Sequence, residues 1–419
     1  MHPAALLDMT SDLLRAVLRL DQPADGIVSA FFRQHKALGP RERHTLAETA
    51  YAVLRQRLVL QHLAQSGSGP LERRLAILAW QGSDVFLRGA LALHEQQWLA
   101  QVQTIDRSTL PEKLRHNLPD WLAGALQAQL ADEFWPLARA LEEPAPLDLR
   151  VNTLKARRDE VQQALATAGI SAEPTPFSPW GLRVRGKPAI NKLELFTKGA
   201  FEVQDEGSQL LELITDPKRG EMVVDFCAGA GGKTLALGAS MRSTGRLYAF
   251  DVSGHRLDAL KPRLARSGLS NVYPAQIAHE RDDRIKRLAG KIDRVLIDAP
   301  CSGLGTLRRN PDLKWRQSPK SVEELQAKQM AILASAARLL KPGGRLVYAT
   351  CSLLRAENED VADAFTEAHK ADFEPLPALA ALEAAHVAAP APLVLGPYLR
   401  LWPQRHGTDG FFAALWQRR

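Results

Sequence analysis

Residues 223–234 read Val-Val-Asp-Phe-Cys-Ala-Gly-Ala-Gly-Gly-Lys-Thr, an apolar β-branched run that ends in a glycine-rich turn. The run predicts a buried strand, and the turn predicts the start of a helix. Glycines let the backbone approach a ligand closely, and the amides of a helix N-terminus face that ligand. A purely structural turn is the alternative. The stretch therefore predicts the first strand-turn-helix unit of an α/β domain, with a candidate ligand site at the turn.

Strands and helices alternate on both sides of this turn. Strands are predicted at 222–227, 246–251, 272–277, 293–298 and 344–350, with helices between them that include 256–266 and 321–340. This alternation is typical of a mainly parallel, doubly wound sheet. Upstream, residues 1–140 lack strand alternation and predict helices, whereas 147–152 predicts a strand and 159–168 a helix. Residues 376–396 are rich in Ala and Pro and predict a loop or insertion.

Length and composition indicate an ordinary globular protein of two or three domains. The 419 residues are 45% hydrophobic and 24% charged. Three cysteines are too few for a disulfide framework and favour reduced thiols in a cytoplasm. The N-terminus shows no signal-peptide pattern, and no apolar run is long enough to span a membrane. The net charge of +7 suits a polyanionic partner, and its excess lies in residues 151–419, with 38 Lys and Arg against 30 Asp and Glu.

An acidic residue supports a nucleotide-like ligand at the glycine turn. Asp251 ends the strand that follows the turn, where a carboxylate can bind the paired hydroxyls of a ribose. A helix N-cap is the alternative for this residue. The glycine spacing is not G-x-G-x-x-G, which argues against NAD. Gly232-Lys233-Thr234 matches the end of a phosphate-binding P-loop, but Cys227 stands where the first glycine of that motif belongs.

Two cysteine motifs follow two of the predicted strands. They are Asp298-Ala299-Pro300-Cys301-Ser302-Gly303 and Tyr348-Ala349-Thr350-Cys351-Ser352. A thiolate is the natural nucleophile for carbon 6 of a cytosine or uracil ring, and its addition lets carbon 5 accept a methyl group from S-adenosylmethionine. One cysteine that attacks and one that assists release make chemical sense together. Asp298 and Lys233 are the charged candidates for assisting the ring. Buried, inert thiols are the alternative.

The chain from about residue 147 to its end resembles the RNA (cytosine-5) methyltransferase family, in its RsmB/Sun-like branch. The matching stretches are Arg150–Thr153, Val203–Ser208, the glycine turn, Asp298–Gly303, Arg308–Asp312, Tyr348–Ser352 and His406–Phe412. The resemblance implies a Rossmann-like methyltransferase sheet in which Cys351 is the nucleophile and Cys301 promotes product release. It assigns to the S-adenosylmethionine pocket Cys227, Ala228, Gly229, Ala230, Gly231, Gly232, Lys233, Asp251 and Asp298.

The resemblance also implies a domain plan and a substrate. Residues 1–141 resemble an all-helical NusB-like domain that binds RNA or a partner, 147–221 a small α+β RNA-contacting subdomain, and 222–419 the catalytic domain. Small-subunit ribosomal RNA is the expected substrate of this cytoplasmic enzyme, which is expected to act as a monomer without a metal. Three alternatives stay open, namely transfer RNA as substrate, a P-loop nucleotide hydrolase and a non-catalytic RNA-binding assembly factor.

The sequence departs from the family's motifs in two places. The family's Ala-Ala-Pro-Gly-Gly-Lys turn has lost its proline here, and His279 stands where the family has an acid on the adenine side, with Glu280, Asp282 and Asp283 beside it.

Phosphate-binding groups are predicted in a helical strip (Arg33, Lys36, Arg41, Arg43, Arg55, Arg57) and in two clusters, Arg281-Arg284-Lys286-Arg287-Lys291 and Arg308-Arg309-Lys314-Arg316-Lys320. The second cluster is the better candidate because Trp315 is available to stack on a base. A solvated surface is the alternative for the strip and for the first cluster.

Overall fold

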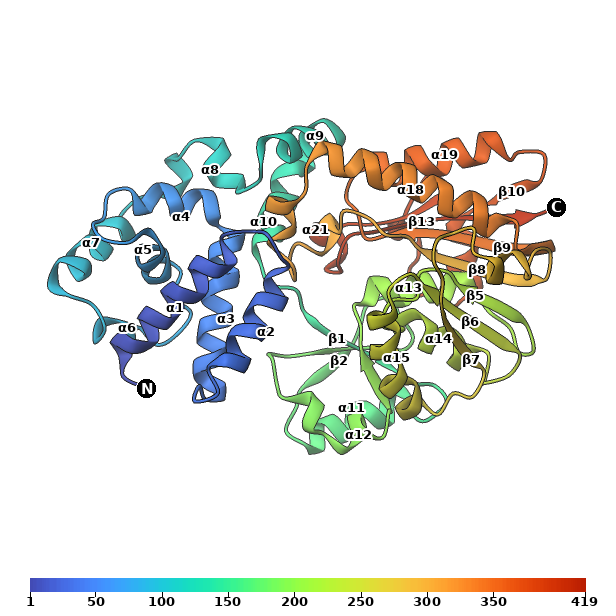
Figure 1. Cartoon of the computed structure of the whole chain (residues 1–419), viewed down its shortest axis with the longest axis horizontal. Helices are drawn as coiled ribbons and strands as arrows, with labels where there is room; N and C mark the ends of the chain where they lie inside the picture. The colour runs from blue at the N-terminus through green and yellow to red at the C-terminus, as the bar shows by residue number, and fades with distance from the viewer. The chain divides into compact units, whose positions relative to one another are not determined.

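A computed structural model describes all 419 residues, which divide into two compact units (Figure 1). We call Met1–Pro144 together with Thr306–Pro319 the helical unit, and Ala145–Gly305 together with Lys320–Arg419 the α/β unit. The second segment of the helical unit, Thr306–Pro319, directly follows the Cys301 loop and is therefore far from the first segment in sequence.

The helical unit contains no strand, as predicted for residues 1–140. Its helices are α1 (Pro3–Val17), α2 (Ala24–Gln34), α3 (Pro40–Arg55), α4 (Arg57–Ala64), α5 (Leu71–Leu78), α6 (Asp84–Arg88), α7 (Leu93–Gln103), α8 (Glu112–His116), α9 (Asp120–Leu130), α10 (Phe134–Glu142) and α17 (Leu313–Arg316). Apolar faces such as that of α1, with Leu7 and Leu14 fully buried, form one core. Trp315 of α17 packs against this core.

The α/β unit begins with a small antiparallel sheet in the order β2-β3-β1-β4. Its strands are β1 (Leu147–Val151), β2 (Ala172–Pro174), β3 (Gly181–Val184) and β4 (Phe201–Val203), accompanied by α11 (Arg158–Thr167) and α12 (Glu194–Thr197). Leu149 and Leu182 of the sheet are fully buried with Val161 and Leu165 of α11. Strand β1 and helix α11 lie where the sequence predicts them.

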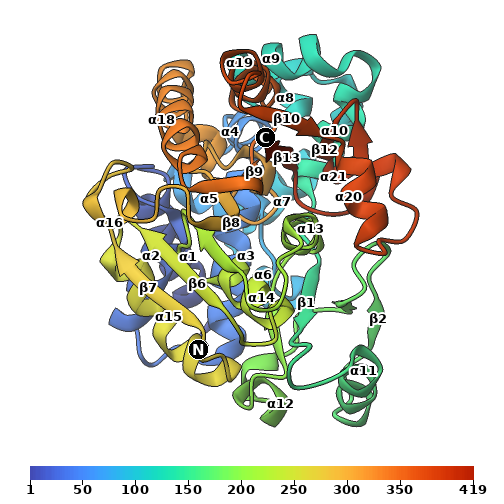
Figure 2. The same cartoon turned by 90° about the vertical axis from the view of Figure 1, so that its right-hand side faces the viewer.

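The large sheet has the order β11-β12-β13-β9-β8-β5-β6-β7, which Figure 2 shows from β7 to β12. Its strands are β5 (Met222–Asp225), β6 (Arg246–Asp251), β7 (Val272–Gln276), β8 (Ile292–Asp298), β9 (Leu340–Thr350), β10 (Phe373–Leu376), β11 (Val394–Leu395), β12 (Tyr398–Leu401) and β13 (Phe411–Arg418). Strands β5 to β9 pair in parallel, whereas β13 pairs with β9 in the antiparallel sense. The predicted Rossmann-like, mainly parallel sheet is therefore confirmed.

Helices cover both faces of this sheet, and alternate residues of each strand enter two different cores. Val223 and Leu296 pack on the side of α13, α14 and α15, whereas Val224 and Val295 pack on the side of α18 and α19. The helices of the unit are α13 (Glu206–Thr215), α14 (Gly232–Ser240), α15 (Gly254–Ser267), α16 (Asp283–Lys286), α18 (Pro319–Ala337), α19 (Glu359–Ala368), α20 (Ala378–Ala384) and α21 (Pro403–His406). Strands buried on both faces explain the continuous apolar runs in the sequence.

The prediction of a loop at 376–396 is wrong in part, because α20 forms within it. Ala378 and Leu382 of this helix are fully buried in the core of the α/β unit. Alanine has the highest helix propensity, and the tertiary burial of this short apolar face outweighs the flanking prolines.

The order of the strands reverses between β5 and β8, where β6 and β7 extend to one side and β9 to the other. Ligands of open α/β sheets bind outside the carboxyl ends of the strands at such a point. The glycine turn follows β5, and the two cysteine motifs follow β8 and β9. The fold therefore brings the predicted site residues to one edge of one sheet.

Candidate active site

The glycine turn has a backbone that requires glycine at two positions. Gly229 and Gly231 have φ angles of +56° and +79°, in the left-handed region. A Cβ on Gly231 would lie 2.1 Å from Cδ1 of Leu260, so the turn packs directly against α15. Gly231 is also the N-cap of α14, and the amides of the first turn of α14 follow it. The turn is thus held close to its neighbours without the proline that the family has in this motif.

Asp251 is buried and holds the turn in place. Its Oδ2 accepts a hydrogen bond from the Gly229 amide at 2.8 Å, and its Oδ1 accepts one from the Ser253 amide at 2.8 Å. The N-cap of α15 is instead Ser253, whose hydroxyl accepts from the Arg256 amide at 3.4 Å. Each Asp251 oxygen retains a second lone pair for a ligand hydroxyl. Arg256 lies 3.6 Å from Oδ2 with its own side chain largely exposed.

Lys233 and Asp298 form an ion pair with an Nζ–Oδ2 distance of 2.8 Å. Burial opposes the charge of Lys233, but the Asp298 carboxylate outweighs burial and raises the pKa of the ammonium above its usual range. The neighbouring Thr234 donates its hydroxyl proton to Asp225 at 2.6 Å. A P-loop needs this lysine for phosphates and this hydroxyl for Mg²⁺. Both groups are engaged inside the protein, which argues against the P-loop alternative.

The two sulfur atoms of Cys301 and Cys351 lie 3.5 Å apart. Strands β8 and β9 are paired in parallel up to Asp298 and Ala349, so the two loops leave the sheet side by side. Contact with Cys351 and burial both raise the pKa of the Cys301 thiol. Two thiolates at this separation repel, so the pair favours a single negative charge. The third cysteine, Cys227, has a pKa raised by burial, as an unreactive thiol would.

A cavity of about 560 Å³ joins these groups. Its lining includes Cys227, Asp251, Asp298 and both Cys301 and Cys351. Such a volume is typical of sites for cofactor-sized ligands. A smaller cavity of about 210 Å³ shares Cys227 and Asp298 with it and is also lined by Ala228, Ala230, Gly232 and Lys233. Of the predicted cofactor residues, Gly229 and Gly231 line neither cavity, and the others line one or both.

His279 and Glu280 also line the larger cavity. Nδ1 of His279 accepts a hydrogen bond from the Arg281 amide at 3.1 Å, so in the neutral ring the proton is on Nε2. Asp282 instead accepts from the Ala278 and Arg284 amides, at 3.0 and 2.9 Å, and caps α16. Of the four candidates in the sequence, His279 and Glu280 face the cavity.

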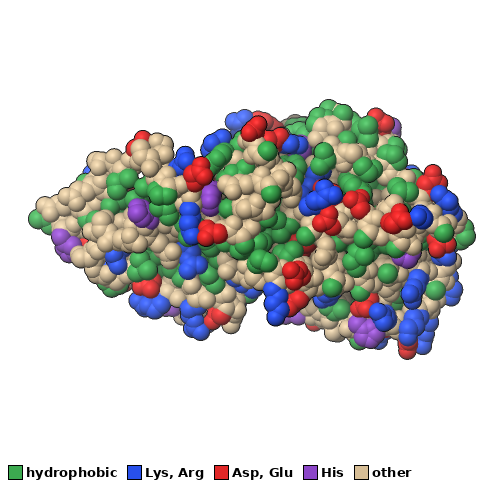
Figure 3. Space-filling view, turned by 90° about the horizontal axis from the view of Figure 1, so that it is seen from above, with side chains coloured by type: hydrophobic (Ala, Val, Ile, Leu, Met, Phe, Trp, Pro, Cys, Tyr) green, Lys and Arg blue, Asp and Glu red, His purple; other side chains and the backbone are tan.

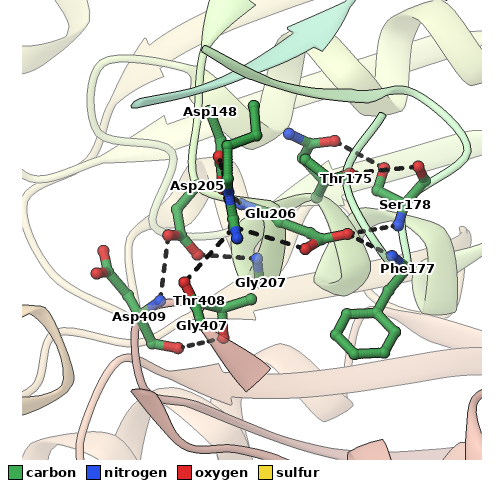
Figure 4. Close-up of polar contacts among 12 residues, drawn as sticks. Asp148, Thr175, Phe177, Ser178, Asp205, Glu206, Gly207, Gly407, Thr408 and Asp409 are labelled. Atoms are coloured by element: carbon green, nitrogen blue, oxygen red, sulfur yellow. Dashed lines mark hydrogen bonds and ion pairs between the residues drawn. The ribbon is translucent and has the colours of Figure 1, made fainter. Parts of the chain in front are cut away.

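Two motifs of the resemblance serve the architecture of the α/β unit. Figure 4 shows that Oδ2 of Asp205 accepts from the Asp409 amide at 3.1 Å, which joins the chain before α13 to the chain before β13. Beside it, the fully buried Glu206 accepts from the Phe177 and Ser178 amides at 2.6 and 2.8 Å. Burial raises the pKa of Glu206. These contacts fix the small sheet against the large one.

The prediction that the second basic cluster binds RNA is wrong for its central members. Lys314 is 2% exposed and donates to the Arg55 carbonyl at 2.7 Å, and Nε1 of Trp315 donates to the Leu54 carbonyl at 2.7 Å. Arg55, predicted to lie on the RNA-contacting strip, is 8% exposed. The amphipathic side chains of this segment complete the core of the helical unit, which local composition could not reveal.

The first basic cluster, in contrast, is exposed throughout. Its members are Arg281, Arg284, Lys286, Arg287 and Lys291. It follows His279 and Glu280 of the cavity directly in the sequence, although Lys286 pairs with Asp283 at 2.8 Å. On the face drawn in Figure 3, basic side chains are interspersed with acidic ones. No group of three or more His, Cys, Asp or Glu side chains is arranged to hold a metal ion, and no helix is long and apolar enough to cross a membrane.

Comparisons with known proteins agree with the resemblance to methyltransferases. Residues 212–417 match the family model described as 16S rRNA methyltransferase RsmB/F, and 118–191 match the ferredoxin-like domain of RsmF/B-like methyltransferases. The chain is 31% identical to a probable ribosomal RNA small subunit methyltransferase B of Synechocystis, over 96% of this chain and 97% of that one. The chain belongs to the RsmB/F family of 16S rRNA methyltransferases. Membership favours methylation of small-subunit ribosomal RNA over the hydrolase and assembly-factor alternatives.

Further relatives extend this result to sequence and structure. A probable small subunit methyltransferase B of Bacillus subtilis is 32% identical over 79% of this chain and 73% of its own. Among solved structures, PH0851 matches all of this chain and 99% of its own with a TM-score of 0.81 at 27% identity. A methyltransferase homologue of Pyrococcus horikoshii matches 75% of this chain and 100% of its own, with a TM-score of 0.62 at 31% identity. The similarity to solved structures thus extends over the residues of both units.

Sequence reasoning missed one group in this RsmB/F site. Glu357 of η5 (Arg355–Glu357) is fully buried and contacts the serine that follows each cysteine. The only signal in the sequence is an acidic residue six positions after Cys351, and exposed helix starts carry such residues routinely.

Proposed function

We propose that this RsmB/F enzyme methylates carbon 5 of a cytosine in small-subunit ribosomal RNA through a covalent bond to Cys351. The observation that carries the proposal is the pair of thiols 3.5 Å apart, at the ends of adjacent strands, in the lining of a cavity that also contains Asp251 and Asp298. Two thiols at a ligand cavity match a reaction that needs one group to attack and another to assist release.

The cavity fits S-adenosylmethionine, which supplies the methyl group when bound. Asp251 would hold the ribose hydroxyls with its remaining lone pairs, as a carboxylate at the end of the second strand does in doubly wound folds. The turn from Cys227 to Lys233 would hold the amino-acid part, with Asp298 at the border between cofactor and base. His279 and Glu280 would face the adenine from the cavity wall.

The residues divide the reaction between them. The Cys351 thiolate adds to carbon 6 of the cytosine, forming an S–C bond while the ring's double-bond electrons move toward carbon 5 and the N3 side. The Lys233–Asp298 pair supplies a proton and electrostatic support on that side. After methyl transfer to carbon 5, the proton on that carbon passes to water with the assistance of Cys301, and the proton added on the N3 side returns to the Lys233–Asp298 pair. The double bond re-forms and the Cys351 thiolate leaves. The net change replaces one ring hydrogen by a methyl group and releases one proton.

The electrostatics of the site support this assignment. The charged Lys233 interacts favourably with the Cys351 side chain, and this interaction contributes to the raised pKa of Lys233. The raised pKa of Cys301, caused by its contact with Cys351 and by burial, favours the protonated form of this second thiol. A nucleophile needs a thiolate and an assisting group needs to exchange a proton, so the two environments match two different roles.

Bisulfite sequencing of RNA from cells with and without the gene tests the reaction. We expect one or more 16S cytosines to resist conversion only when the gene is present, and a plasmid-borne Cys351→Ala gene to fail to restore them. Resistance that appears in transfer RNA instead would move the substrate to the alternative. Methylation of 16S RNA without any bisulfite-resistant cytosine would overturn carbon 5 as the acceptor.

Calorimetry tests the cofactor site separately from the chemistry. Loss of a hydrogen bond to a charged group costs about 1.5–3 kcal/mol, so Asp251→Ala is expected to weaken S-adenosylmethionine binding by roughly ten- to a hundredfold. Asp251→Asn keeps one acceptor for the turn and serves as the control for local folding. ATP is expected to bind far more weakly than S-adenosylmethionine, and tight ATP binding with none for S-adenosylmethionine would overturn the assignment.

A further inference from the structure

Glu357 is a buried carboxylate with four hydrogen-bond donors around it. Oε1 accepts from the Ser302 amide at 2.8 Å and from Nε2 of Gln329 at 3.0 Å. Oε2 accepts from the Ser302 hydroxyl at 2.5 Å and from the Ser352 hydroxyl at 2.5 Å. The residue is 0% exposed. The carboxylate thus has two hydrogen-bond donors beside each of its oxygens.

These contacts join the two cysteine loops directly. Ser302 follows Cys301 in the sequence and Ser352 follows Cys351, and their hydroxyl oxygens lie 3.2 Å apart. The loops are also joined by a hydrogen bond from the Gly305 amide to the Cys351 carbonyl at 2.8 Å. The Glu357 side chain therefore bridges the residues that directly follow the two cysteines.

The carboxylate is itself held on several sides. The hydroxyl of Tyr348 donates to the Glu357 carbonyl at 2.6 Å, and Nε2 of Gln329 also donates to the Pro300 carbonyl at 3.0 Å. Nδ2 of Asn358 donates to the Ser352 carbonyl at 3.0 Å. Three separate segments thus converge on this side chain, and both of its carboxylate oxygens are hydrogen-bonded, although Oε1 of Gln329 has no partner. Buried hydrogen-bonded networks rigidify their surroundings.

We propose that Glu357 is a positioning residue that holds Cys301 and Cys351 at their working separation by accepting hydrogen bonds from the serine after each of them. The inference rests on the proposed covalent mechanism, in which both thiols must reach the same ring. Glu357 touches neither sulfur and acts through Ser302 and Ser352. Its charge also contributes to the raised pKa of Cys301, after the contact with Cys351 and burial.

A pair of variants separates geometry from charge. In Glu357→Gln, the amide oxygen still accepts from the Ser302 amide and Gln329, while its NH₂ donates to the two hydroxyls after they rotate. We expect Glu357→Gln to keep kcat within about fivefold of the wild type. Glu357→Ala removes all four hydrogen bonds, and we expect kcat to fall roughly 30- to 100-fold with the KM for S-adenosylmethionine within about twofold. Rescue by glutamine is an outcome that a role in charge alone would not give.

Glu206→Gln is the matched control, since Glu206 is equally buried but bonds to backbone amides in the Asp205–Asp409 cluster. We expect Glu206→Gln to lower the melting temperature while leaving kcat unchanged. If Glu357→Ala does not fold, the double variant Ser302→Ala/Ser352→Ala removes the two hydroxyl contacts and leaves the carboxylate two donors. A smaller fall in kcat, of roughly five- to tenfold, is expected from it.

Two results would overturn the proposal. One is a folded Glu357→Ala enzyme, or a folded double serine variant, with wild-type kcat. The other is a glutamine variant as inactive as the alanine variant. Failure of the underlying mechanism is distinguishable, because Cys301→Ala would then form no covalent RNA adduct on a denaturing gel and the wild-type enzyme would form no 5-methylcytosine.

Discussion

The two cysteine loops carry the same Cys-Ser pair and share the carboxylate of Glu357, but the chain continues from them into different parts of the molecule. The Cys351 loop is completed within seven residues, by Glu357 and Asn358 immediately downstream. The chain that leaves the Cys301 loop instead enters the helical unit at Thr306, where Lys314 and Trp315 are anchored. The nucleophile proposed here thus sits on a locally determined loop, and the release-assisting thiol on a loop whose downstream end depends on distant residues.

The largest expected effect distinguishes the two thiols. Cys351→Ala removes the group that attacks the ring and is expected to lower methylation by about 10³-fold or more, without an RNA adduct. Cys301→Ala permits attack and methyl transfer but not release, so the enzyme should stall on its RNA. A denaturing gel with labelled RNA and S-adenosylmethionine should show a slow-migrating band for Cys301→Ala alone. The opposite pattern would exchange the two roles.

The fold and the position of the site followed from sequence because they depend on local pattern and general topology. Strands such as β5 and β8 are buried on both faces and therefore have continuous apolar runs. The carboxyl ends of parallel strands share one edge, so turns after three strands must meet there. Cys301, Cys351, Asp251 and the Lys233–Asp298 pair were predicted in this way, although their chemical roles remain predictions.

Contacts between distant segments could not be predicted. Glu357 is buried by Ser302, Gln329 and Ser352, which come from three separate parts of the chain. Lys314 and Trp315 have the composition of an RNA-binding surface, yet they lie inside the helical unit because α17 adds to its core. An aromatic residue between basic ones is compatible with either environment until the tertiary partner is known.

The two serines should sharpen the contrast between the loops. Ser352→Ala removes one hydrogen bond from the Cys351 loop and is expected to slow adduct formation by roughly five- to tenfold. Ser302→Ala removes the equivalent bond from the Cys301 loop and should slow release by a similar factor, since each bond to a charged acceptor contributes about 1.5 kcal/mol or more. Single-turnover measurements separate the two steps. Equal effects of both variants on both steps would show that the loops act as one rigid unit.

Basic residues near the site provide a smaller effect. The exposed Arg281 and Arg287 are expected to bind phosphates, so their replacement by Ala should weaken RNA binding by about threefold to tenfold. The salt dependence should also fall, by about one ion for each phosphate that the variant no longer neutralises. Lys370, exposed at the end of α19 and paired with Glu367, is the control. Filter binding at several salt concentrations measures both quantities. If the slope of log affinity against log salt concentration is unchanged, this cluster is a solvated surface that does not neutralise RNA phosphates.

The smallest effect on methylation is expected from substitution of Lys314, which should change the stability of the protein instead. Burial lowers the pKa of Lys314 to about 7, from an ordinary value of 10.5. Between these values the unfolded chain binds one more proton than the folded chain, so the free energy of unfolding should rise with pH, by at most about 1.4 kcal/mol per pH unit. Below pH 7 both states are protonated, and the cost of burying the charge stays constant.

Lys314→Met has a similar length and no titrating group, so it should remove that rise while leaving kcat near the wild-type value. Denaturant unfolding of the full chain between pH 7 and 9.5 measures the slope. The half-buried Glu142, which accepts from Asn117 at 2.6 Å and attracts Lys314, provides a second test. Glu142→Gln removes the attraction and should shift the rise to lower pH. Equal slopes for the wild type and Lys314→Met would mean that Lys314 remains charged where it is buried, with the Arg55 carbonyl and Glu142 sufficient to hold it.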